Sequence, residues 1–265
     1  MQNTFVPFLC PVCRKPLVRQ GNTLRCPLGH SFDLAKQGYV NLLMKNGRGK
    51  RHGDDKLMVT SRREFLEKGY YAPLRDAVST LVGQGKIVLD AGCGEGYYTS
   101  SFAEHNQVLG IDISKDALHC AAPRCRNARF AVASISDIPL PSESVDTVVT
   151  IFAPDSNREF LRVLRPGGHL ITALPMENHL WELKQAVYDT PYKNPPVDPA
   201  REGFILAGSR ELRYTITLRS NEDIQALFKM TPYYYKTSAE DQKKLLSLST
   251  LTTQLEFFVT DYQKL

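Results

Sequence analysis

The sequence of 265 residues contains no long uninterrupted apolar run, because its apolar stretches are strand-sized and charged residues separate them. A helix that spans a bilayer needs about 20 consecutive apolar residues, so the sequence predicts no transmembrane helix. The first residues also lack the basic segment and long apolar stretch that mark a signal peptide. We therefore expect a cytoplasmic protein that does not act at a membrane.

Glycine and proline are not over-represented, at 17 and 16 residues, and we find no internal repeat. This composition excludes collagen-like, repeat-built and wholly disordered chains. With 42% hydrophobic residues, a chain of this length can bury a sizeable core. It suits one large domain or two unequal ones.

Acidic residues are scarce in the first part of the chain. Residues 1–70 contain 13 Lys and Arg against 5 Asp and Glu, whereas residues 71–265 contain 20 against 23. Residues 45–56, KNGRGKRHGDDK, include no apolar residue and predict an exposed basic loop. This asymmetry favours a polyanionic partner for the N-terminal part. The alternative is a lysine-rich surface that is simply solvated.

Half of the six cysteines lie within the first 26 residues. Cys10, Cys13, Cys26 and His30 follow the spacing C-x2-C-x12-C-x3-H. Two pairs of N/S ligands at this spacing are typical of a tetrahedral zinc site. Four protein ligands leave no open position on the metal, so the zinc is predicted to be structural. The alternative is that reduced cysteines pack here as small apolar residues.

Strands and helices alternate from residue 86 onward, which predicts a parallel α/β sheet. Two helical patterns precede it and end before Gly69 and Gly83. The chain then finishes with period-2 strands, which fit an antiparallel edge, and the proline-rich segment 189–203 is predicted to be a loop or lid. The expected strands are 86–90, 108–112, 129–133, 145–152, 169–174, 210–218 and 251–262, and the expected helices are 98–104, one from Ser114, 157–164 and 179–187.

The segment VLDAGCGEG at 88–96 predicts a cofactor-binding loop. Asp90 ends a strand, and Gly92 and Gly94 allow a ligand to approach the backbone closely. Asp112 ends the next strand, where nucleotide-binding α/β folds place an acidic residue on ribose hydroxyls. A dinucleotide-binding oxidoreductase is the competing interpretation. However, Asp90 and Glu95 would repel a pyrophosphate, so the loop favours a cationic cofactor.

This loop and the segment RVLRPGGHLI at 162–171 resemble those of class I methyltransferases, whose cofactor S-adenosylmethionine is a sulfonium cation. The resemblance implies an α/β fold with a Rossmann-like sheet, here with an antiparallel C-terminal edge and a small zinc-binding domain in front. One position departs from the pattern. The place after the third strand that often holds an acidic residue for the adenine amino group holds Ser134, with Asp137 nearby.

Nearly the full chain resembles the 23S rRNA guanine-N1 methyltransferases of the RlmA family. The resemblance implies methyl transfer from S-adenosylmethionine to N1 of a guanine in a 23S rRNA hairpin near the peptide exit tunnel. It also implies a possible homodimer and, in some lineages, an effect on macrolide-type antibiotic susceptibility. The segments that carry it are CPVC, CPLGHSFDLAKQGYVNLL (26–43), VLDAGCGEGYYT (88–99), IFAP (151–154), PMENHL (175–180) and MTP (230–232).

The same resemblance extends the cofactor contacts to Tyr71, Tyr98, Thr99 and His179. Guanine N1 must lose a proton before it attacks a methyl group, and a carboxylate or imidazole near the methyl can accept it. Asp155, just after IFAP, and His179 are the two candidate bases. Tyr233, Tyr234 and Tyr235 are candidates for stacking on RNA bases or, equally, for packing in a loop.

We expect a zinc-binding domain at 1–35, a basic linker and helical segment at 36–85, and a methyltransferase domain at 86–265. Two other functions compete with rRNA methylation. One is methylation of a small molecule, which would need neither the zinc module nor the basic N-terminal part. The other is a non-catalytic zinc-containing RNA-binding protein, which would not need an intact glycine loop and Asp112.

Overall fold

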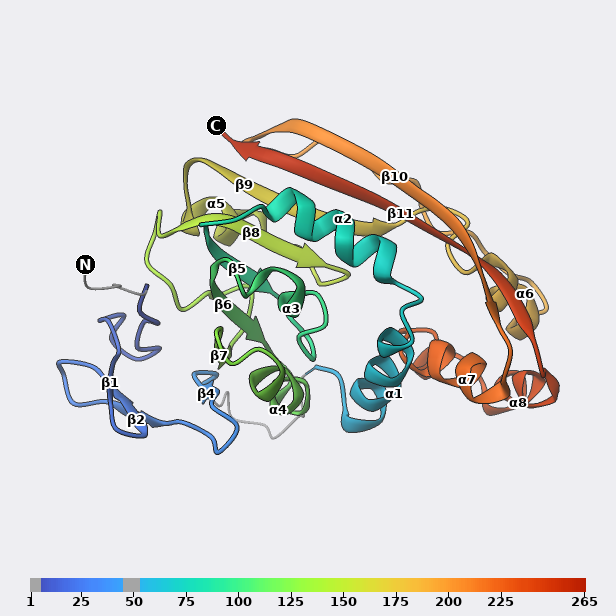
Figure 1. Cartoon of the computed structure of the whole chain (residues 1–265), viewed down its shortest axis with the longest axis horizontal. Helices are drawn as coiled ribbons and strands as arrows, with labels where there is room; N and C mark the ends of the chain where they lie inside the picture. The colour runs from blue at the N-terminus through green and yellow to red at the C-terminus, as the bar shows by residue number, and fades with distance from the viewer. Residues whose placement is uncertain (1–5, 45–52) are drawn as a thin grey trace.

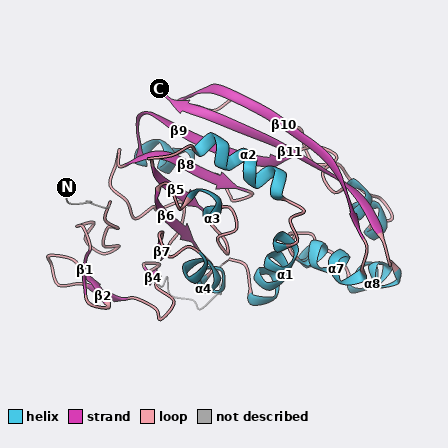
Figure 2. Ribbon diagram, in the orientation of Figure 1, coloured by secondary structure: helices cyan, strands magenta, loops and turns pink. Residues whose placement is uncertain are grey.

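The computed structural model describes residues 6–44 and 53–265. These residues form two sheets, one small and antiparallel, the other an eight-stranded sheet with helices packed against it (Figures 1 and 2). In Figure 1 the small sheet lies near the N-terminus in blue, and the C-terminal helices lie at the far end of the molecule. The α/β fold with a separate N-terminal module is therefore as expected.

The large sheet has the strand order β10-β11-β9-β8-β5-β6-β7-β4. Its members are β4 (Val40–Asn41), β5 (Ile87–Ala91), β6 (Gln107–Asp112), β7 (Arg129–Val132), β8 (Val145–Ile151), β9 (Leu164–Pro175), β10 (Phe204–Leu218) and β11 (Leu251–Lys264). The small sheet consists of β1 (Val18–Gln20), β2 (Thr23–Arg25) and β3 (Ser31–Asp33).

The helices of the described residues are α1 (Lys56–Glu67), α2 (Ala72–Val82), α3 (Thr99–Phe102), α4 (Lys115–Arg124), α5 (Asn157–Val163), α6 (Trp181–Val187), α7 (Asn221–Lys229) and α8 (Ala239–Lys244). Two short 3-10 helices, Tyr234–Lys236 and Leu245–Ser247, flank α8. Among these helices, none is long and apolar enough to cross a membrane.

The centre of the large sheet is parallel, and one edge is antiparallel because β11 runs opposite to its two neighbours. Strands β9, β8, β5, β6 and β7 pair in parallel, whereas β11 pairs antiparallel with both β9 and β10. The central strands are covered on both faces, which is why they are continuous runs of β-branched and other apolar residues. The predicted antiparallel C-terminal edge is confirmed.

The N-terminal module packs directly against the large sheet. The backbone N–H of Leu9 donates a 2.8 Å hydrogen bond to the carbonyl of Pro139, just beyond β7. Phe8 and Leu17 are buried in the same apolar cluster as Ile138. Because a module this small has little core of its own, this shared cluster supplies part of its apolar burial.

The segment expected to be a linker contributes to the sheet. Val40 and Asn41 form β4, which pairs in parallel with β7 at the edge of the large sheet. Helices α1 and α2 also belong to the main core, since Phe65 and Leu74 are fully buried. Residues 45–52 of the expected basic loop lie outside the described residues.

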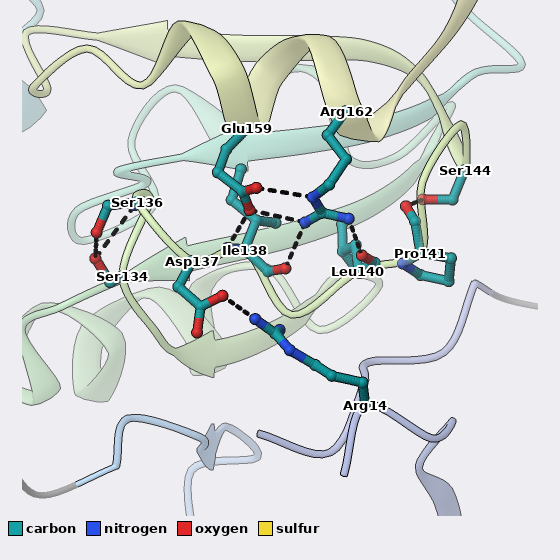
Figure 3. A network of polar contacts seen from close by, with 10 residues as sticks. All are labelled: Arg14, Ser134, Ser136, Asp137, Ile138, Leu140, Pro141, Ser144, Glu159 and Arg162. Atoms are coloured by element: carbon teal, nitrogen blue, oxygen red, sulfur yellow. Dashed lines mark hydrogen bonds and ion pairs between the residues drawn. The ribbon is translucent and has the colours of Figure 1, made fainter. Parts of the chain in front are cut away.

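Arg162 of α5 organises the loop on which the N-terminal module rests (Figure 3). Its guanidinium forms a bidentate ion pair with Glu159, at 2.7 and 2.8 Å. It also donates to the carbonyls of Ile138 and Leu140, at 2.8 and 2.7 Å. Glu159 accepts the backbone N–H of Ile138 at 2.7 Å. Figure 3 shows Arg14 of the module reaching Asp137 in this same loop.

We predict that Arg162→Met lowers the free energy of unfolding by about 2–3 kcal/mol, because Glu159 and two carbonyls lose their charged donor. Urea unfolding measures this change. The matched control is Arg165→Met, since Arg165 forms one exposed ion pair with Asp146 at 2.5 Å, and such pairs contribute about 0–1 kcal/mol. Equal losses in both variants would contradict the role given to Arg162.

Candidate functional site

The four predicted metal ligands converge in the N-terminal module. The Sγ atoms of Cys10, Cys13 and Cys26 and a ring nitrogen of His30 all lie within 4.8 Å of one another. Each half-site is a tight turn: Arg14 donates its backbone N–H to Cys10, and Gly29 does so to Cys26, at 2.8 and 3.0 Å. Sequence spacing and tertiary structure therefore agree on one four-ligand set.

The distances within this set fit a tetrahedral zinc ion. The Sγ atoms of Cys13 and Cys26 are 3.6 Å apart, and His30 Nδ1 lies 3.6 and 3.3 Å from the Sγ atoms of Cys10 and Cys26. Ligands placed tetrahedrally about 2.0–2.3 Å from zinc are roughly 3.4–3.8 Å apart. The set leaves no place for a fifth ligand or substrate, so the zinc has a structural role.

The glycine loop after β5 lies against the turn after β8. Gly92 has a φ of +84°, and a Cβ built on it would lie 2.6 Å from the Cβ of Ala153. Any larger residue at position 92 would push the two segments apart. This contact brings together the carboxyl ends of neighbouring parallel strands, where open α/β sheets bind their ligands.

Three buried carboxyl groups surround the glycine loop. Burial, opposed by a 2.6 Å hydrogen bond from Thr99 and reinforced by Asp112 and Glu95, raises the pKa of Asp90 to about 7. Burial also raises the pKa values of Glu95 and Asp112. Asp112 accepts the backbone N–H groups of Gly94 and Ser114 at 2.9 and 2.7 Å. Negative charges on carboxyl groups buried close together favour the binding of a cation.

Two arginines partly compensate this charge. The guanidinium of Arg62 lies beside the glycine loop, 3.9 Å from where a Cβ on Gly94 would be. It forms an ion pair with Asp54 at 2.5 Å and donates to the carbonyl of Met230 at 3.3 Å. Arg124 approaches Glu95 at 3.6 Å. The sequence did not single out Arg62, because nothing in its pattern distinguishes it from the other basic residues of the N-terminal part.

Tyr71 and His179, 108 residues apart, meet at this edge of the sheet. The Tyr71 hydroxyl is 3.5 Å from His179 Nε2. Glu256 donates its backbone N–H to His179 Nδ1 at 3.3 Å, so Nε2 carries the proton of the neutral ring. Burial and then Lys184 lower the pKa of His179 to about 3. The ring is therefore neutral at physiological pH and offers a donor rather than a basic nitrogen.

Tyr98 and Thr99 differ in what they offer a ligand. The Thr99 hydroxyl is engaged with Asp90, as described above. The Tyr98 hydroxyl is buried without a hydrogen-bond partner among the described residues. A buried hydroxyl without a partner is costly unless a ligand satisfies it. Tyr98 and the three carboxyl groups therefore fit a ligand that has hydroxyl groups and a positive charge, as S-adenosylmethionine does.

Asp155 lies at the same edge of the sheet. It comes three residues after Phe152, the first residue of the turn after β8. Its side chain is 58% exposed and accepts a 3.0 Å hydrogen bond from Arg201. Arg201 belongs to the segment 189–203, which has neither helix nor strand, as expected of a loop. The other end of this loop is held by Lys184, which donates to Tyr192 O and Asn194 Oδ1 at 3.1 and 2.7 Å.

The remaining predicted groups lie away from the glycine loop or are engaged elsewhere. Ser134 pairs with Ser136, and Asp137 binds Arg14 rather than facing the glycine loop. Tyr235 is 56% exposed, and its hydroxyl donates to Asp55. Of two surface cavities, of about 670 and 520 Å³, neither is lined by a predicted catalytic, cofactor-binding or metal-binding residue, although Asp137 lines the second.

Sequence reasoning missed Phe152 as a site residue, although it lies in the segment IFAP. Phe152 follows β8 with a φ of +54° and is 43% exposed. Its ring packs near Tyr71 and Phe257, at centroid distances of 6.4 and 5.6 Å. A backbone conformation of this kind cannot be read from a sequence.

Comparison with known proteins identifies two family models in this chain. Residues 8–47 match the N-terminal zinc ribbon model described as RlmA, and residues 88–168 match a methyltransferase domain. Among curated proteins, a Bacillus subtilis protein named as a putative 23S rRNA (guanine-N(1)-)-methyltransferase is 33% identical over 91% of both chains. A 23S rRNA (guanine(748)-N(1))-methyltransferase of Streptomyces fradiae is 37% identical over 71% of this chain and 70% of its own.

Solved structures support the fold alone. The YcgJ protein of Bacillus subtilis superposes with a TM-score of 0.53 at 15% identity, over 74% of this chain and 99% of its own. The [4+2]-cyclase SpnF reaches a TM-score of 0.50 at 19% identity, over 72% and 80%. The large sheet is thus the class I methyltransferase fold, with S-adenosylmethionine as its cofactor.

We predict that the protein binds one zinc ion per chain and that Cys26→Ala abolishes this binding. The ribbon would lose its cross-link, and we expect the thermal midpoint to fall by roughly 5–10 °C. Metal analysis and thermal unfolding measure these changes. The matched control is Cys120→Ala, which removes a half-buried thiol outside the ligand set. Full zinc occupancy in Cys26→Ala would contradict the ligand assignment.

We predict that S-adenosylmethionine binds more tightly as pH rises from 6 to 7.5. With a pKa of about 7, Asp90 holds a proton in the free protein below pH 7, and a cationic ligand favours the carboxylate, so binding releases that proton. Affinity should rise by up to about tenfold per pH unit below the pKa. Calorimetry measures the affinity of the wild type and of Asp90→Asn across this pH range. The ligand titrates equally in both experiments, so the difference between the two proteins is the contribution of Asp90. An equal pH dependence in both proteins would contradict it.

Proposed function

The chain belongs to the family of 23S rRNA (guanine-N1)-methyltransferases, and on this premise we propose that it transfers a methyl group from S-adenosylmethionine to N1 of a guanine in 23S rRNA. The observation that carries the proposal is the combination of an intact acidic glycine loop with a zinc ribbon in one chain. A relative named as a putative 23S rRNA (guanine-N(1)-)-methyltransferase matches over 91% of both chains. Methylation of a small molecule would not require the zinc ribbon.

The glycine loop and its carboxyl groups bind the cofactor in this proposal. Asp112 has both oxygens positioned by backbone N–H groups, and each retains a lone pair for a ribose hydroxyl. Asp90 and Glu95 are the other two buried carboxyl groups beside the loop and add negative charge. When bound, S-adenosylmethionine supplies an electrophilic methyl group on a positively charged sulfur.

Asp155 is the proposed acceptor of the guanine N1 proton. It is an exposed carboxylate at the carboxyl edge of β8, and Arg201 holds it at 3.0 Å. His179 is the weaker of the two candidates, because its Nε2 is protonated and its pKa is about 3. We assign His179 instead a positioning role, in which it orients Tyr71 and donates a hydrogen bond at this edge.

The ribbon and the basic residues of the N-terminal part are the proposed rRNA-binding surface. Lysine and arginine contacts to phosphates position an RNA without reading its sequence. The substrate places the enzyme in the cytoplasm in this proposal. The hairpin near the exit tunnel, the homodimer and the effect on macrolide susceptibility stay predictions of the family resemblance.

Primer extension across 23S rRNA tests the proposed function. A methyl group on N1 blocks Watson–Crick pairing, so reverse transcriptase stops one nucleotide before the modified guanine. We expect a stop only in cells that express the gene. The relative from Streptomyces fradiae is named for guanine 748, and we expect the modified guanine at the equivalent position, with the stop one nucleotide before it.

Variants of two carboxylates make this experiment specific for the proposed base. Asp155→Asn should lower the methylation rate by about 10²–10⁴-fold. The matched control is Asp137→Asn, since Asp137 is a similarly exposed carboxylate, 61% against 58%, that also pairs with an arginine. A primer-extension stop as strong in Asp155→Asn as in the wild type would show that Asp155 is not the base. No stop with the wild-type gene, despite expression, would overturn the rRNA substrate.

A further inference from the structure

Phe152 has two unfavourable features that packing does not explain. Its φ of +54° lies in the left-handed region, which a bulky side chain rarely adopts. The residue is 43% exposed, although a phenylalanine gains most when it is buried. Strained backbone and exposed aromatic surface at one residue are typical of a binding site.

The location of Phe152 connects it with the cofactor loop. It follows β8 directly, and β8 is the neighbour of β5 in the sheet. The next residue, Ala153, is the one that packs against Gly92. Phe152 is therefore one residue from the contact between the two strand ends, at the edge where the reacting atoms must meet.

The surroundings of Phe152 hold its ring in place. Tyr71 and Phe257 pack near it at 69° and 46° between ring planes, and they are 3% and 0% exposed. His179 packs behind them, 4.8 Å from Phe257. Phe152 is thus the exposed member of an otherwise buried aromatic cluster, with part of its ring surface open to a ligand.

The other exposed aromatic residues of the described chain do not share this position. Tyr192 is 50% exposed and lies over Lys184, at 4.9 Å from its Nζ. Tyr235 is 56% exposed and uses its hydroxyl to bind Asp55. Neither is adjacent in sequence to a residue that contacts the glycine loop.

We propose that Phe152 is the platform on which the target guanine stacks, with N1 held towards the methyl donor. This inference rests on the proposed function and adds a residue that binds the substrate base. A base that leaves its place in RNA loses its stacking neighbours, and an aromatic ring replaces them. The partly exposed Phe152 lies at the carboxyl end of β8, beside the residue that packs on the glycine loop, where such a base would lie.

Three substitutions separate stacking from structural support. Phe152→Tyr keeps the ring and should keep kcat/KM within about threefold. Phe152→Leu removes the ring and should lower kcat/KM for unmethylated 23S rRNA by about 30-fold, which is about 2 kcal/mol at 1.36 kcal/mol per tenfold change. Phe152→Gly relieves the strained φ, so its thermal midpoint should stay near that of the wild type while activity falls at least as far.

Binding measurements provide readouts that do not depend on activity. S-adenosylmethionine affinity, measured by calorimetry, should be the same in Phe152→Leu and wild type. The chain has a single tryptophan, Trp181, so Phe152→Trp in a Trp181→Phe background reports on position 152 alone. Its fluorescence should be quenched when unmethylated 23S rRNA is added with S-adenosylhomocysteine, since a base stacks on the indole.

The outcomes distinguish this inference from the proposed function. Loss of cofactor affinity in Phe152→Leu would place Phe152 in the cofactor pocket and overturn the stacking role. Wild-type kcat/KM in Phe152→Leu, or no quenching in the tryptophan variant, would also overturn it, while rRNA methylation by the wild type would still stand. If the wild-type protein methylates no 23S rRNA, the proposed function itself fails.

Discussion

The contact between the glycine loop and the turn after β8 is the constraint on which the site depends. A Cβ at Gly92 would lie 2.6 Å from the Cβ of Ala153, so the two strand ends can meet only because residue 92 has no side chain. Through this contact the glycine loop and the segment that contains Phe152 and Asp155 form one unit. Their relative position is then set by backbone packing, which varies less than side-chain rotamers do.

Electrostatics at this edge follow from that close packing. Asp90, Glu95 and Asp112 are buried together, and burial, reinforced by neighbouring carboxyl groups, raises their pKa values. Arg62 and Arg124 offset part of it. In the proposed function a cationic cofactor offsets the rest, so the same carboxyl groups that oppose stability in the free protein favour binding.

The zinc ribbon and the large sheet are joined by a different kind of interaction. The ribbon obtains its internal order from metal ligation, but its position comes from Leu9, Phe8 and Leu17 packing against the loop after β7. Arg162 holds that loop by charged hydrogen bonds. In the proposed function this packing sets the position of an RNA bound to the ribbon relative to the edge of the sheet that holds the glycine loop.

Much of this could be predicted from residue patterns. The C-x2-C-x12-C-x3-H spacing predicted the ligand set, because a tight turn places both cysteines of a pair on one metal. Apolar runs that end in Asp90 and Asp112 predicted parallel strands and a cofactor edge. The sequence did not predict the strand Val40–Asn41, since a two-residue strand has no periodicity to detect.

Local pattern by itself determined the zinc ligands, the alternation of strands and helices, and the acidic glycine loop, because each depends on residues close together in the chain. Tertiary structure alone decided the rest. It placed Tyr71 beside His179 across 108 residues and left Tyr98 with an unsatisfied hydroxyl. It also gave Phe152 its left-handed backbone and its partial exposure, because a local residue pattern sets neither the φ of a single residue nor its contact with solvent.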